Sequence, residues 1–188
     1  MASDPQDRWP PSGDDSVPVS SVLRTGMRCG VRVAALLWRR QLHIHREREG
    51  EIVELDDGRH FLVYRATSSS APHDPGDAPD GELVTLAVWF RLWAVPPGAH
   101  MLAYLFERES MLNTVLFAGC PGYRTKLWSV DRDTLDYAGF YTWEGRSSAE
   151  RYRRYISAVL RPLSIRGSVG GRVDAPGDPP SWRVIPTM

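Results

Sequence analysis

The order of predicted secondary-structure elements after residue 82 constrains the fold more than any other feature of this sequence. In chain order, they are a strand over 82–95, a helix from about His100, a hairpin over 121–145, a helix over 147–163 and a short strand over 167–173. This β-α-β-β-α-β order predicts an α+β fold, the ferredoxin-like split βαβ with an antiparallel sheet. Both helices of such a sheet lie on one face. The other face must be buried, usually against a second copy, so we expect a homodimer with an apolar interface.

Turn and capping residues set the boundaries of these elements. Pro96-Pro97-Gly98 ends the first strand, and the hairpin turns at 131–134. The second helix has Ser147 at its start and Glu150 three residues later, the pattern of a capping box, and Pro162 ends it. The residues expected to give the first helix its apolar faces are Met101, Tyr104, Leu105, Met111, Leu112 and Val115.

The remaining chain divides at stretches rich in Pro, Gly and Ser. The predicted segments are a disordered leader over 1–20, a helix and β-hairpin extension over 21–66, a flexible linker over 67–82, the barrel domain over 83–173 and a tail over 174–188. Within the extension, an apolar stripe predicts a helix over 21–42, and Asp56-Asp57-Gly58 predicts a hairpin turn. We expect this helix to lie on the barrel or its partner subunit, and the hairpin to extend or cover a sheet edge.

Composition excludes several classes of protein. Lys plus Arg and Asp plus Glu number 23 each, so no net charge favours nucleic acid as a partner. Two cysteines without C-x-x-C spacing are typical of a reducing cytoplasm rather than of a disulfide scaffold. The longest unbroken apolar run, residues 33–38, is far shorter than the ~20 residues that span a bilayer. We therefore expect a cytoplasmic protein that is not inserted in a membrane.

Several short motifs in the second half resemble those of one known superfamily. They are Pro121-Gly122-aromatic, Lys126-Leu127-Trp128, Ala138-Gly139-x-Tyr141, and a capped helix with Ala149 and Tyr152. Over roughly residues 83–173 the chain resembles the dimeric α+β-barrel superfamily of small mono-oxygenases related to the antibiotic-biosynthesis mono-oxygenases. The resemblance implies two monomers that pair their sheets into a barrel, with an apolar pocket between sheet and helices. Members include cofactor-independent oxygenases, cyclases, decarboxylases and haem-degrading enzymes, so the fold does not settle the function.

The hairpin over 121–145 carries six aromatic rings, on Tyr123, Trp128, Tyr137, Phe140, Tyr141 and Trp143. A barrel buries both faces of its hairpins, so most of these rings are expected in a core or interface, and one or two in a pocket wall. Gly139 is expected to let a neighbouring ring or backbone approach closely.

No strong catalytic motif is present in the sequence. G-x-S-x-G, phosphate-loop, Rossmann and H-E-x-x-H patterns are absent, and His43 and His45 imply no third metal ligand, so no metal or other cofactor is expected. The candidate catalytic residues are Asn113, His100 and Tyr141; the candidate substrate-binding residues are Arg91, Trp89, Phe90, Tyr104, Trp128 and Trp143. Asn113 would hold a carbonyl or enolate oxygen, Arg91 an anion, and His100 would act as a base. A helix cap, a dimer salt bridge and an exposed side chain are the respective alternatives.

These features favour a small-molecule enzyme of specialised metabolism that acts on an aromatic or polyketide-like substrate without metal or flavin. The reaction would be oxygenation of an electron-rich ring or a cyclisation assisted by proton transfer. The alternative is a non-catalytic binding or assembly protein that uses the barrel as a dimeric scaffold. Convergence of Asn113, Arg91, His100 and Tyr141 on one cavity would favour the enzyme.

Overall fold

The computed structural model describes residues 41–70, 82–96, 98–109, 117–174 and 177–185. The predicted leader, the predicted helix up to residue 40 and Asn113 lie outside these residues. Leu42, the last residue of that predicted helix, instead begins a strand.

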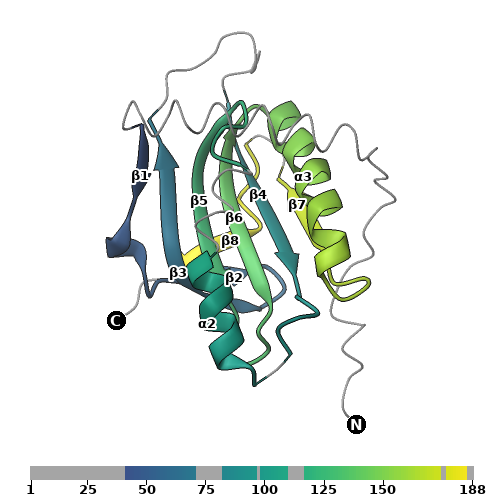
Figure 1. Cartoon of the computed structure of the whole chain (residues 1–188). Helices are drawn as coiled ribbons and strands as arrows, with labels where there is room; N and C mark the ends of the chain where they lie inside the picture. Colours follow the sequence, from purple (N-terminus) through teal and green to yellow (C-terminus); the bar gives the residue numbers. More distant parts are fainter. Residues whose placement is uncertain (1–40, 71–81, 97, 110–116, 175–176, 186–188) are drawn as a thin grey trace.

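One curled antiparallel sheet forms the body of the described chain (Figure 1). Its strands are β1 (Leu42–Ile44), β2 (Ile52–Leu55), β3 (His60–Ser69), β4 (Leu83–Phe90), β5 (Tyr123–Val130), β6 (Tyr137–Glu144), β7 (Gly170–Val173) and β8 (Trp182–Ile185). The helices are α2 (His100–Glu109) and α3 (Arg146–Leu160), and the 3-10 turns are η2 (Arg46–Arg48) and η4 (Arg161–Leu163). The strands follow the order β7-β4-β6-β5-β3-β2-β8, and β1 also pairs with β3.

Four neighbouring strands, β7-β4-β6-β5, confirm the predicted ferredoxin-like fold. Taken in chain order they stand as fourth, first, third and second, and every pairing between them is antiparallel. Helix α2 connects β4 to β5 and helix α3 connects β6 to β7, as the split βαβ requires. The aromatic hairpin is β5-β6, with its turn at the predicted residues.

The N-terminal hairpin extends this sheet rather than standing apart from it. β3 pairs with β5 from Leu62↔Val130 to Ser68↔Thr125, so β5 is no longer an edge strand. β3 continues to Ser69, inside the stretch predicted as linker. The predicted tail also contains a strand, because β8 pairs with β2.

The sheet face opposite α3 is covered by the chain itself. The β2-β3 hairpin and β8 curl behind the central strands (Figure 1), and together they enclose an apolar core. Phe140 of β6 meets Phe61 of β3 at 5.8 Å and Trp182 of β8 at 5.2 Å between ring centroids. A homodimer is expected from the sequence because one face of the sheet would otherwise be exposed. This face is covered within the chain, so that argument for a homodimer does not apply.

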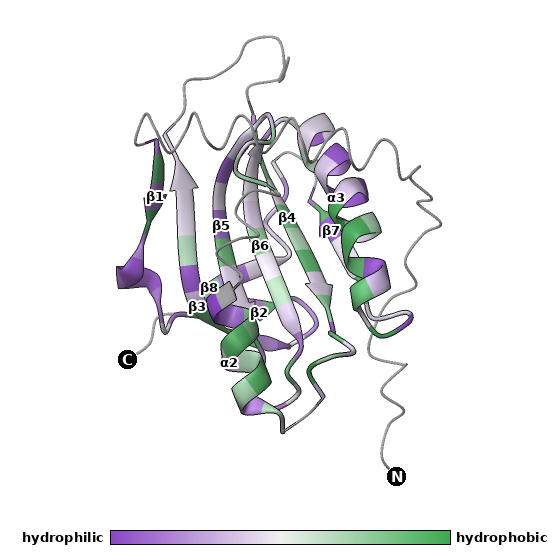
Figure 2. Ribbon diagram, viewed as in Figure 1, coloured by the Kyte–Doolittle hydropathy of each residue, from purple (hydrophilic) through white to green (hydrophobic). Residues whose placement is uncertain are grey.

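Helix α2 does not present the face that its sequence predicts. Met101 is 78% exposed and Tyr104 61%, and Leu105 is also exposed. The residues that face inward are Ala103, Phe106 and Glu107. The ring centroids of Phe106 and Tyr137 lie 4.7 Å apart, and Glu107 forms an ion pair with Arg132 of the β5-β6 turn. Apolar residues lie around much of the helix (Figure 2), so periodicity alone could not select the buried side.

Helix α3 begins without the predicted capping box. Its N-cap is Gly145, which has a φ of 74° and makes no side-chain cap hydrogen bond. The positive φ lets the chain turn directly from β6 into the helix, so Ser147 already lies in the first turn. The helix ends at Leu160, before Pro162, as predicted.

Candidate functional site

A small cavity lies between the helix-facing side of the sheet and the helices α2 and α3. Its volume is about 70 Å³. Pockets that hold drug-sized ligands are roughly 300–1,000 Å³, so this cavity accepts a small compound or one end of a larger one. The wall is aromatic and aliphatic, with lining residues that include Phe90, Phe106, Trp128, Tyr137, Tyr141 and Ile156.

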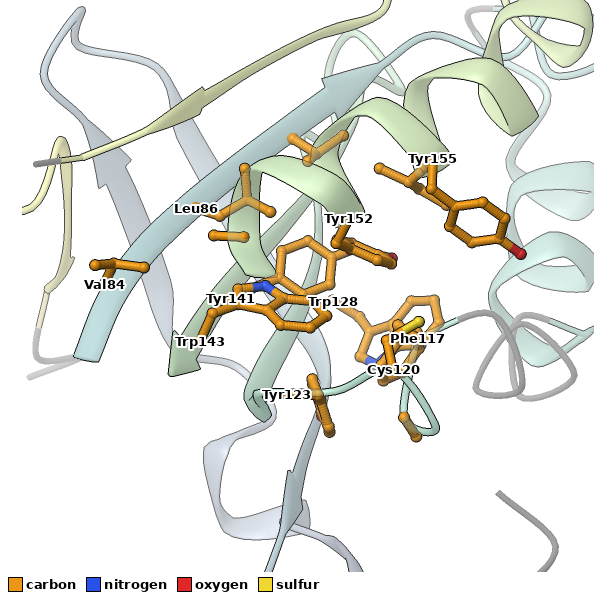
Figure 3. Close-up of a cluster of buried hydrophobic side chains, with 14 residues drawn as sticks. Val84, Leu86, Phe117, Cys120, Tyr123, Trp128, Tyr141, Trp143, Tyr152 and Tyr155 are labelled. Carbon is orange, nitrogen blue, oxygen red and sulfur yellow. The ribbon is translucent and has the colours of Figure 1, made fainter. Parts of the chain in front are cut away.

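Aromatic rings of the β5-β6 hairpin form both the core and part of this wall. All six predicted rings are buried. Trp128, Tyr137 and Tyr141 line the cavity, whereas Trp143 is packed in the core against Tyr152 at 4.6 Å (Figure 3). A Cβ at Gly139 would lie 2.8 Å from the Tyr141 hydroxyl, which confirms the predicted close approach of a ring.

The most unusual group in the wall is Lys126. It is the only lysine in the chain, and the other 22 of the 23 Lys and Arg residues are arginines. β5 places it on the same face as Trp128, opposite Tyr141 of β6 and Thr67 of β3. The side chain is 6% exposed and lines the cavity. Its Nζ lies 3.1 Å from the centroid of the Trp128 ring.

The electrostatic surroundings of Lys126 favour the neutral amine. Burial lowers the pKa of its ammonium well below the usual value, and the positive charge of Arg65 lowers that pKa further. The other contacts of Nζ are with the rings of Phe117 at 4.3 Å and Tyr141 at 4.9 Å. No carboxylate forms an ion pair with Lys126 in the part of the chain that the structure describes. Ring faces attract a cation but compensate only partly for lost hydration.

A pair of buried phenols lies beside this amine. The Tyr152 hydroxyl donates to the Tyr141 hydroxyl at 3.2 Å, and both residues line the cavity (Figure 3). Burial raises the pKa of both phenols, so they stay protonated at neutral pH. Because Tyr141 accepts from Tyr152, its own proton is left to donate to an oxygen in the cavity.

Two further buried donors belong to lining residues. The Trp128 indole N–H and the Tyr137 hydroxyl are buried without a hydrogen-bond partner among the described residues. Such groups cost free energy when they remain unpaired. A wall with these donors therefore suits a ligand that carries an acceptor oxygen.

Three of the residues predicted for the site, Tyr141, Phe90 and Trp128, reach this cavity. Trp89 instead lies on the opposite face of the sheet, in the core closed by β2, β3 and β8. Trp143 is in the helix-side core, outside the lining.

The predicted polar constellation does not assemble in the described residues. Arg91 forms a two-point ion pair with Asp136, a carboxylate that is 2% exposed, so it is not available to a substrate anion. His100 is exposed at the start of α2, and Tyr104 is exposed on the same helix. Asn113 lies outside the described residues, so only Tyr141 remains of the four residues expected to converge.

The histidines of the "HIH" sequence make ordinary hydrogen bonds. His43 bonds Ser70 at 3.1 Å, and His45 bonds Ser68 at 2.6 Å and Glu47 at 2.8 Å. Within the described ranges, no group of three potential ligands could hold a metal ion. None of the helices seen in those ranges has the length and apolar character needed to cross a membrane.

Fold and site together define a ferredoxin-like α+β protein with an aromatic cavity between its sheet and helices. Neither a family model nor a curated protein sequence matches the chain. The similar solved structures include a heme-degrading enzyme from Listeria monocytogenes, with 11% identity, a TM-score of 0.41, and coverage of 62% of this chain and 70% of that one.

Two further similar structures come from the same genus. One is a ferredoxin-fold protein from Listeria monocytogenes related to antibiotic biosynthesis monooxygenases, with 9% identity, a TM-score of 0.39 and coverage of 70% and 67%. The other is a monooxygenase-like protein from Listeria innocua, with 10% identity, a TM-score of 0.37 and coverage of 62% and 63%. Similarity at this level carries no information about activity, and the fold assignment stands on the strand order described above.

Proposed function

We propose that this protein is a small-molecule enzyme in which Lys126 removes a proton from a phenolic or enolisable substrate. One observation supports this function most directly: the sole lysine is buried in the cavity wall, with no carboxylate paired to it in the described chain. A lysine whose pKa is lowered by burial can act as a general base near neutral pH.

The neighbouring groups suit the anion that such a step creates. The amine of Lys126 takes the proton, and the resulting ammonium pairs with the substrate oxyanion inside an apolar wall. The Tyr141 hydroxyl, oriented by Tyr152, donates to the same oxyanion. Proton transfer and anion stabilisation by these residues require neither a metal nor a flavin.

The substrate anion has two productive fates, and both begin with the same proton removal. Attack on dioxygen by an electron-rich ring would make the protein a cofactor-independent mono-oxygenase. Attack of the carbanion on a second carbonyl of the same substrate would make it a cyclase. The cavity volume of about 70 Å³ favours a small aromatic or enolic substrate, or one end of a polyketide-like one.

Deuterium exchange tests the proton-removal step without knowledge of the natural substrate. Purified protein in deuterated buffer is mixed with small 1,3-diketones, and loss of the signal from the C–H between the two carbonyls is followed by NMR beside a protein-free blank. We expect catalysed exchange by the wild type and by Arg166→Lys, an exposed-site control, but not by Lys126→Met. Exchange by Lys126→Met at the wild-type rate would show that the amine is not the base.

A non-catalytic binding protein is the second candidate, and the failure of His100 and Arg91 to reach the cavity favours it. This alternative predicts that the same compounds bind, as seen in ligand-detected NMR, without exchange above the buffer rate. Their binding would then be lost on filling the cavity, for example with Val159→Phe at a partly buried lining position.

A further inference from the structure

Lys126 also has the surroundings needed for covalent chemistry. We propose that its amine condenses with a small aldehyde or ketone in the cavity to form an imine. This activity uses the same amine as the proposed function, but it does not require the removal of a substrate proton.

The placement of Nζ favours a nucleophile over a structural cation. Nζ lies 3.1 Å from the Trp128 ring centroid, 4.3 Å from that of Phe117 and 4.9 Å from that of Tyr141. A nitrogen surrounded by rings, with no acceptor oxygen bonded to it in the described residues, keeps its lone pair for a ligand. Desolvation in an apolar pocket is one of the ways in which proteins activate a lysine towards carbonyl carbons.

The choice of residue type supports the same conclusion. A guanidinium remains charged at every physiological pH and cannot form an imine, whereas a buried amine can lose its proton. The chain uses arginine at all its other Lys and Arg positions, and its only lysine stands at the cavity. Among the Lys and Arg side chains, the only one that can become a neutral amine is thus the one that faces the apolar cavity.

The condensation balances with the groups present. The Nζ lone pair attacks the carbonyl carbon, and the carbonyl π pair moves to oxygen. The nitrogen then loses one proton and the oxygen gains one, which gives a neutral carbinolamine. The Tyr141 hydroxyl, which accepts a hydrogen bond from Tyr152, can donate a hydrogen bond to that oxygen, and the proton released by the nitrogen balances the one that the oxygen takes. The C–O bond then breaks: the hydroxyl takes a second proton and leaves as water, while the nitrogen forms the C=N bond and gives up its remaining proton. No oxidant, reductant or metal is needed.

The cavity size sets the substrate class. A volume of about 70 Å³ offers too little contact area for tight non-covalent binding of a small compound. A covalent bond to Nζ overcomes this limit. Short aliphatic aldehydes and ketones, with an acceptor oxygen for the Tyr141 donor, fit these requirements.

Reductive trapping tests the inference directly. Full-length wild-type protein is incubated near pH 6 with acetaldehyde or acetone and sodium cyanoborohydride, and the alkylated residue is located by peptide mass spectrometry. Reaction at the α-amino group is mapped separately. The matched control is the Arg166→Lys variant, in which an exposed lysine competes with Lys126 in the same molecule.

We expect Lys126 to be alkylated at least about tenfold faster than the introduced exposed lysine, because each unit of lowered pKa gives about ten times more neutral amine. In urea-denatured wild-type protein, Lys126 should be alkylated more slowly than in the native wild type, a comparison that needs no variant. Equal or slower alkylation of Lys126 in the native protein would overturn the inference. Trapping without diketone exchange would refute the proposed function alone, and exchange without trapping would refute the imine alone.

Discussion

Replacement of Lys126 by methionine should stabilise the protein in a pH-dependent way. The side chain is 6% exposed, and burial is the main cause that lowers its pKa in the folded state. The unfolded chain has a lysine pKa of about 10.4. Between the two pKa values the unfolded state binds one more proton than the folded state, so the free energy of unfolding of the wild type rises with pH.

The size of this effect follows from proton linkage. The slope reaches at most about 1.4 kcal/mol per pH unit over the window between the folded pKa and about pH 10.4. Lys126→Met has no such proton and a similar side-chain volume. It should therefore be more stable than the wild type near pH 7, and its advantage should shrink as the pH rises towards about 10.

Urea denaturation followed by tryptophan fluorescence measures both proteins at a series of pH values. In the difference between their free energies of unfolding, the contributions of all ionisable groups that the two proteins share cancel, provided that the m-values agree. Arg166→Lys keeps Lys126 and adds an exposed lysine, so the difference between its free energy of unfolding and that of the wild type should show no comparable slope with pH. A difference between wild type and Lys126→Met that stays constant over this window would refute the conclusion that Lys126 is buried with a lowered pKa.

Three other changes test the packing around the site. Gly139→Ala places a Cβ 2.8 Å from the Tyr141 ring and should cost about 1–3 kcal/mol of stability, measured as a lower melting temperature beside the exposed control Arg166→Lys, which should leave it unchanged. Arg91→Met leaves the buried Asp136 carboxylate unpaired and should lower the free energy of unfolding by about 3–5 kcal/mol. The double variant Arg91→Met/Asp136→Leu should recover most of this stability, and no recovery would contradict the pairing. Deletion of residues 1–66 removes β2 and most of β3 and should give insoluble protein, whereas deletion of 1–18 should leave solubility and melting temperature unchanged.

The ferredoxin-like core could be predicted from sequence because its signals are local. Alternation in β4, the aromatic hairpin and the stop at Pro162 each lie within one short window. β8 has only four residues and follows a Pro-rich stretch, so it has no detectable periodicity. Its pairing with β2 depends on contacts across more than a hundred residues, which short sequence patterns cannot reveal.

Three of the residues that the sequence suggests for a site, Tyr141, Phe90 and Trp128, line the cavity. Arg91 pairs with Asp136, which lies 45 residues further along the chain, so short sequence patterns do not reveal this partner. Lys126 belongs to the Lys126-Leu127-Trp128 motif and is not among the site residues that the sequence suggests. Its sign in the sequence was its uniqueness: one lysine among 23 Lys and Arg residues, alternating with an aromatic residue in a strand.

The core on the sheet face opposite α3 is closed by strands that are separated in the sequence by the whole ferredoxin-like unit. β2 and β3 precede it, β8 follows it, and β2 and β8 pair with each other from Ile52↔Ile185 to Leu55↔Trp182. On the ribosome, the apolar side of Phe140 therefore stays incompletely covered until β8 has emerged. Domains of this size generally fold as units during or just after synthesis. Pairing of β8 with β2 completes the cover of this apolar core. A ribosome-bound chain that stops before β8 should therefore expose apolar side chains and bind chaperones.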